Sequence, residues 1–143
     1  MKINFKLSSK FEKELKSKIE AIQESTSVSI YVHVSLSDDN DALERAEEVF
    51  DALEVHKSPL RMGFLLYLSL SGKELVFLSD ESLKNAVDES FFLNAQEAMI
   101  EHLKLGQVQL GIESALNILS SKLAVISKVQ EGILPIVSVS VEE

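Results

Sequence analysis

Four charged residues lie where the chain changes direction, and together they could bind a metal ion or a phosphate group. Arg61 precedes a nearly continuous apolar stretch at residues 63–70, and Asp80 follows the next apolar stretch. Asp88 and Glu89 come one short helix later. Converging carboxylates suit a hard cation such as calcium or magnesium, so Asp80, Asp88 and Glu89 are candidate metal ligands. An arginine at the same corner could hold a phosphate group, which makes Arg61 a candidate phosphate ligand.

Each of these residues also has a structural explanation. Asp80 stands where it could cap a short helix, and Asp88-Glu89 could favour the start of the next helix through the helix dipole. Arg61 could simply form an ion pair with Asp80. The residues alone leave both interpretations open.

The remaining polar candidates favour structural roles. The acidic run at residues 38–41 lacks the glycine and the final glutamate of an EF-hand loop, so we expect a helix cap and a solvated turn there. His33 lies within a strand pattern and is expected to be a packing or surface histidine. His56, in a loop near Arg61, is expected to be a surface residue close to the Asp80 corner.

The elements that must position these residues follow from hydrophobic spacing. Apolar residues three and four apart predict an amphipathic helix near the start, with Phe11, Leu15, Ile19 and Ile22 on its buried stripe. Alternation of β-branched residues predicts a strand at 28–36. A helix is predicted at 41–54, with Leu43, Ala46, Phe50 and Leu53 on its inner face. Strands are predicted at 63–70 and 74–78, and helices at 82–87, 91–105 and 110–126. The tail at 133–141 is an edge strand or a loose segment.

This order predicts the fold class: an α/β protein with a three-layer α/β/α sandwich around a small, mixed, Rossmann-like sheet. The strand–helix–strand unit favours parallel pairing of the first two strands, and the short turn at 71–73 makes the third strand antiparallel. The end of the third strand is thereby returned beside the loop at residues 56–61. We expect one domain over residues 1–143, with an N-terminal helix in 1–27 and the tail at 127–143.

Composition excludes several classes of function. The formal net charge of -9 argues against nucleic acid and against an anionic membrane surface, both of which attract clustered lysine and arginine. The chain has no cysteine, so thiolate chemistry is excluded. No apolar run approaches about 18 residues and no signal peptide is evident, so we expect no membrane insertion and a cytoplasmic location. Nucleotide-binding and serine-nucleophile motifs are missing from the sequence.

Several short motifs, taken in order, resemble those of the TPM domain family in its short, soluble form. They include Ile30 to Val34 (IYVHV), Arg61 to Leu65 (RMGFL) and Ser79 to Leu83 (SDESL), and the similarity covers about residues 28–123. The departures from the family pattern are Met62 for asparagine, Ser79 and Ser82 for glycines, and Phe92 for tryptophan.

The resemblance implies a binding or assembly module with another protein as partner and with a calcium or magnesium site near Asp80. It also implies an alternative, a metal-assisted acid phosphatase in which Arg61 holds the phosphate. The substitutions at positions 62, 79 and 82 weaken that alternative, so whether the chain is an enzyme stays open at this point, as do its partner and oligomeric state.

Overall fold

The computed structural model describes residues 9–36, 41–88, 90–126, 132 and 134–142. In chain order the elements are α1 (Ser9–Gln23), β1 (Ser29–Ser35), α2 (Ala42–Ala52), the 3-10 turns η1 (Val55–Lys57) and η2 (Pro59–Arg61), β2 (Gly63–Ser69), β3 (Glu74–Ser79), α3 (Glu81–Ala86), α4 (Leu93–Lys104), α5 (Val108–Ile126) and β4 (Val137–Glu142).

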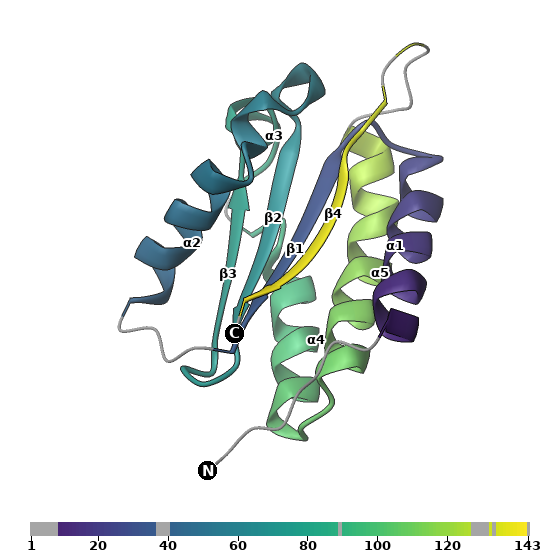
Figure 1. Cartoon of the computed structure of the whole chain (residues 1–143). Helices are drawn as coiled ribbons and strands as arrows, with labels where there is room; N and C mark the ends of the chain where they lie inside the picture. Colours follow the sequence, from purple (N-terminus) through teal and green to yellow (C-terminus); the bar gives the residue numbers. More distant parts are fainter. Residues whose placement is uncertain (1–8, 37–40, 89, 127–131, 133, 143) are drawn as a thin grey trace.

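The strands form one mixed sheet in the order β3-β2-β1-β4. Helix α2 covers one face, while α1, α4 and α5 cover the other (Figure 1). The predicted α/β/α sandwich is therefore confirmed. The tail at 137–142 is a strand at the edge of the sheet, which settles the alternative left open by its sequence.

Strand direction defines two ends of the sheet. β1 pairs in parallel with β2, from Ser29 opposite Gly63 to Ser35 opposite Ser69, and β4 pairs in parallel with the other side of β1. β3 runs antiparallel to β2. We call the end where the parallel strands begin the amino end, and the end where they finish the carboxyl end. Since β3 runs backwards, residue 80 is returned to the amino end, as predicted.

The larger core lies between the sheet and the helices α1, α4 and α5. The predicted stripe of α1 is buried here, with Leu15 and Ile19 fully inaccessible. Strands β1 and β2 are buried along their whole length, because helices cover both of their faces.

The phase of α2 differs from the prediction. Its buried side chains are Ala42, Ala46 and Val49, whereas Leu43 is 51% exposed. Phe50 and Leu53 are only partly buried. The smaller residues let the helix lie close to the sheet, where it packs over Tyr31, Leu65 and Tyr67.

Among the described residues, no helix combines the length and the apolar character needed to cross a lipid bilayer.

Candidate functional site: the Arg61–Asp80 corner

The predicted pairing of Arg61 with Asp80 is present at the amino end of the sheet. Arg61 donates two hydrogen bonds to the carboxylate, from Nε to Oδ2 at 2.8 Å and from Nη2 to Oδ1 at 2.9 Å. The Asp80 side chain is only 5% exposed, while that of Arg61 is 50% exposed. A two-pronged arginine–carboxylate contact fixes both orientation and charge, so this is a rigid corner.

Asp80 is also a helix cap, so the structural interpretation holds. Its Oδ1 accepts a hydrogen bond from the backbone N–H of Glu81 at 2.8 Å, at the start of α3. Its own N–H donates to the carbonyl of Gly63 at 2.8 Å, which ties the end of β3 to the start of β2. Asp80 therefore joins two strands, one helix and the Arg61 loop.

The loop that carries Arg61 has an unusual backbone. Leu60 and Arg61 have φ values of 61° and 55°, in the left-handed region that residues with side chains seldom adopt. Two buried hydrogen bonds fix the loop. The hydroxyl of Tyr31, on β1, lies 3.0 Å from Ser58 Oγ, and Ser58 Oγ donates to the carbonyl of Val55 at 2.6 Å. Two consecutive left-handed residues persist only where the surroundings fix them, and these buried contacts do so.

Close packing in the same loop explains the glycine at position 63. A Cβ atom there would lie 2.6 Å from Val55 Cγ1, 2.8 Å from Ser58 Oγ and 2.8 Å from the carbonyl oxygen of Val55. The glycine of the RMGFL motif is thus required by the approach of η1 to β2.

The electrostatics of the corner favour an ionised Asp80. Hydrogen bonds from Arg61 hold the pKa of Asp80 below its ordinary value, against the opposing effect of burial. The Glu81 N–H and the nearby His56 act in the same direction. His56 therefore lies close enough to influence the corner, as expected.

Of the other two predicted metal ligands, only Asp88 belongs to the described residues, and its recorded hydrogen bonds are local. Asp88 Oδ1 accepts hydrogen bonds from the N–H and the hydroxyl of Ser90, which is a local turn before α4. Glu89 lies outside the described residues. Within the described ranges, no group of three or more histidine, aspartate or glutamate side chains is placed to hold a metal ion.

The acidic run at 38–41 also has the expected role where it can be followed. Asp41 caps α2, since its Oδ1 accepts from the N–H of Glu44 at 3.1 Å. Asp38, Asp39 and Asn40 lie outside the described residues.

A comparison with models of protein families matches residues 6–122 to the TPM domain. The chain belongs to the TPM domain family. Its fold is similar to that in the NMR structure of the BA42 protein from the psychrophilic bacterium Bizionia argentinensis, with a TM-score of 0.84, 23% identity, and coverage of 96% of this chain and 98% of that one. It is also similar to the N-terminal domain of a P. gingivalis protein, with a TM-score of 0.69, 18% identity, and coverage of 87% and 82%. A comparison with curated proteins finds no match.

In this TPM domain, Phe92, which replaces the tryptophan of the family pattern, belongs to an aromatic cluster near the corner. Phe92, at the tryptophan position, stacks on Phe64 with ring centroids 5.1 Å apart. Phe77 and Phe91 meet Phe92 edge-on, at 6.0 and 4.8 Å. This position therefore serves packing here.

A second polar cluster of the TPM domain was missed by sequence reasoning. His33 is 7% exposed, lies 2.6 Å through Nδ1 from Ser140 Oγ, and reaches Glu142 Oε2 at 3.2 Å through Nε2. Glu142 also pairs with Arg45 of α2. Arg45 is the main cause that holds the pKa of Glu142 below its ordinary value. The cluster fastens β4 to the sheet and to α2, and the available signal was the alternation of Ser138, Ser140 and Glu142 with valines.

Proposed function

We propose that this chain is a binding module of the TPM domain type, with another protein as its partner, rather than a phosphatase. The observation that carries the proposal is the mutual engagement of Arg61 and Asp80. Both carboxylate oxygens of Asp80 accept hydrogen bonds from the guanidinium, and one of them also accepts the Glu81 N–H.

The hydrogen bonds between Arg61 and Asp80 argue against a catalytic role for either residue. Metal-assisted phosphoryl transfer needs carboxylates that coordinate the metal and a cation that stabilises charge on the phosphoryl oxygens. In this corner the buried carboxylate of Asp80 and the guanidinium of Arg61 neutralise each other. The exposed Glu81, 3.7 Å from Arg61 Nη2, adds a second negative charge where a phosphate group would have to bind. Both features support a structural role for the corner.

The calcium or magnesium site near Asp80, which the resemblance implies, is not part of this proposal. The corner as it stands does not fit such an ion, because a hard cation needs about six to eight oxygen ligands and the oxygens of Asp80 already accept hydrogen bonds. An ion would therefore have to displace Arg61 from Asp80.

A phosphomonoester assay tests the catalytic alternative. The chain should hydrolyse p-nitrophenyl phosphate no faster than buffer between pH 4 and pH 8, with or without calcium, magnesium or manganese. The informative comparison is the wild type against Asp80→Asn and against Asp51→Asn, a control at an exposed position of α2. Hydrolysis that is retained by Asp51→Asn and lost in Asp80→Asn would overturn the proposal.

Thermal melting tests separately whether calcium or magnesium binds at Asp80. A ligand that binds only the folded state raises the midpoint of unfolding, so an ion bound at Asp80 would stabilise the wild type and Asp51→Asn but not Asp80→Asn. We expect millimolar calcium or magnesium to shift all three proteins equally. A shift confined to the two proteins that keep Asp80 would establish a cation site at the corner.

A further inference from the structure

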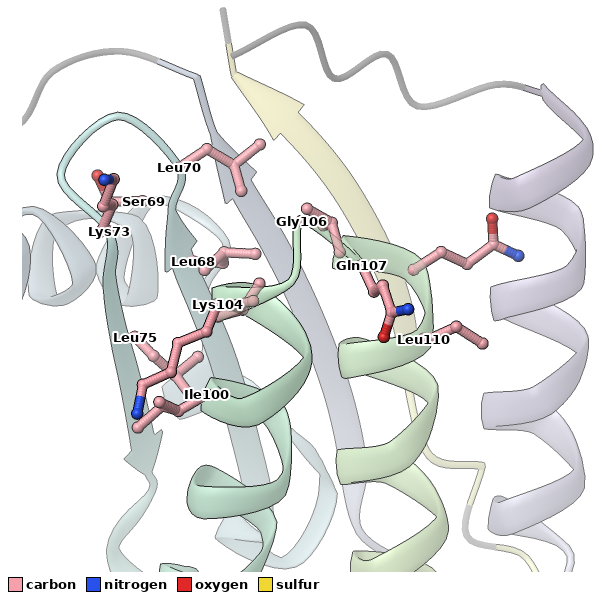
Figure 2. A pocket seen from close by; sticks show the side chains of 13 residues that line it. Leu68, Ser69, Leu70, Lys73, Leu75, Ile100, Lys104, Gly106, Gln107 and Leu110 are labelled. Atoms are coloured by element: carbon pink, nitrogen blue, oxygen red, sulfur yellow. The ribbon is translucent and has the colours of Figure 1, made fainter. Parts of the chain in front are cut away.

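An apolar pocket lies at the opposite end of the sheet from the Arg61–Asp80 corner. It has a volume of about 940 Å³ and lies between the end of β2, the start of β3 and the turn that joins α4 to α5 (Figure 2). Leu68, Ser69 and Leu70 place it at the carboxyl end of the sheet.

The pocket is lined by aliphatic side chains. Strands contribute leucines, α4 contributes Ile100 and Leu103, and α5 contributes Leu110. Ile100 is 41% exposed and Leu110 is 49% exposed, so part of this apolar surface faces water. The volume falls within the range of about 300–1,000 Å³ that is usual for small-molecule sites. Apolar surface of this kind is stabilised when a hydrocarbon chain covers it.

The charge of the pocket is opposite to that of the chain. The protein has 23 acidic and 14 basic residues, yet the described residues that line the pocket include Lys73 and Lys104 and no carboxylate. Lys73 lies in the β2–β3 turn, whereas the Lys104 side chain extends from α4, away from Lys73, toward Leu75 and Ile100 (Figure 2). Lys104 pairs with Glu101 at 3.6 Å, but both side chains are mostly exposed, so the pair is weak and a ligand anion can replace it.

From these observations we propose that the pocket binds a free fatty acid, that is, a single aliphatic chain with one carboxylate. The chain would lie among the leucines and Ile100, and the carboxylate would meet one of the two lysines, Lys73 or Lys104, at the mouth. This inference goes beyond the proposed function and is independent of the Asp80 corner, because the two sites lie at opposite ends of the sheet.

The probe for the test is dodecanoate, used below its micelle concentration, with dodecanol as the uncharged control. Titration of the ¹⁵N-labelled chain should move the amide signals of residues 68–75 and 100–110 first and should saturate at one ligand per chain. Dodecanol should bind at least about tenfold more weakly, since it lacks the charge. Absence of saturable shifts at these residues, or equal binding of the alcohol, would overturn the proposal.

Three variants locate the site. Lys73→Gln with Lys104→Gln should weaken dodecanoate binding by about tenfold, whereas Lys84→Gln, on α3 at the other end of the sheet, should leave it unchanged. Ile100→Glu places a carboxylate in the mouth at an exposed position, so it should abolish binding without unfolding the chain. Unchanged affinity in the double lysine variant would refute the proposed role of the two cations.

Other occupants would give different results. Shifts at the same residues that depend on protein concentration, with no added ligand, would mean that a second copy covers the pocket. Binding to anionic phospholipid vesicles without binding to dodecanoate would mean a membrane surface. Either result overturns the assignment to a free fatty acid.

Discussion

Replacement of Gly63 by alanine tests how tightly the loop before β2 is packed. The added Cβ would lie 2.6 Å from Val55 Cγ1 and 2.8 Å from the Val55 carbonyl oxygen, and Val55 is fully buried. Ser58 Oγ, at 2.8 Å, is held by Tyr31 and by its own bond to the backbone. None of the three atoms belongs to the free end of a flexible side chain, so the backbone of the loop has to shift.

The expected cost is near the upper end for overpacking. Overfilling a packed core costs about 1–3 kcal/mol, and the loss of glycine's freedom in the unfolded chain returns about 0.4–1 kcal/mol. We therefore expect Gly63→Ala to lower the free energy of unfolding by about 2 kcal/mol, which for a chain of this length lowers Tm by about 6–8 °C. Urea denaturation followed by circular dichroism measures the first quantity, and thermal melting measures the second.

Gly106 provides the matched control. It ends α4 with a φ of 72°, and a Cβ there meets no atom of the described part of the chain within 4 Å. Gly106→Ala should therefore cost only about 1 kcal/mol, which is the penalty for a Cβ in the left-handed region less the gain from a stiffer unfolded chain. Asparagine, which tolerates the left-handed region, should restore stability at position 106 but not at position 63. A Gly63→Ala protein as stable as the wild type, or a Gly63→Asn protein that recovers stability, would refute the steric reasoning.

Two further predictions concern the corner and its support. Asp80→Ala should lower the free energy of unfolding by about 1–2 kcal/mol at pH 7, because it removes the α3 cap and both acceptors of Arg61. Asp80→Asn keeps an acceptor for the Glu81 N–H, but it removes the charge and replaces one acceptor of Arg61 by an amide donor. Because the pKa of Asp80 is lowered in the folded state, its charge stabilises the protein above the ordinary pKa of about 3.9, and this stabilisation is lost as the pH falls through the folded-state pKa. The difference in stability between the wild type and Asp80→Asn in urea denaturation should therefore be largest near pH 6 and become smaller as the pH falls below about 3.9. A difference that is constant with pH would contradict this. Tyr31→Phe should cost about 0.5–1.5 kcal/mol in urea denaturation, because it removes the buried hydrogen bond to Ser58; an unchanged midpoint would show that the loop is held without it.

The strand directions and the Arg61–Asp80 pairing could be predicted because they follow from short-range features. The turn after β2 forces β3 to run backwards, and that alone returns Asp80 to the loop of Arg61. The buried stripe of α1 could be predicted for a similar reason, since helical spacing places its four apolar residues on one side.

The phase of α2 and the His33 cluster could not be predicted in the same way. The helix offers two apolar stripes, and the sheet beneath it selects the one with smaller side chains, which leaves Leu43 in water. The partners of His33 come from β4, more than 100 residues further along the chain. The alternation in the tail is compatible with an edge strand or with a loose segment, and it does not show which strand the tail would join.

The position of β4 beside β1 has a consequence for synthesis. Ile30 pairs with Val137, so the outer side of β1 stays uncovered during synthesis until β4, more than 100 residues later, has been made. Contacts between residues so far apart form slowly, because the intervening loop has to close first. A nascent chain that already contains α1 to α5 therefore presents an open row of backbone donors and acceptors along β1, and this stage is when the protein is most exposed to pairing with a neighbouring polypeptide.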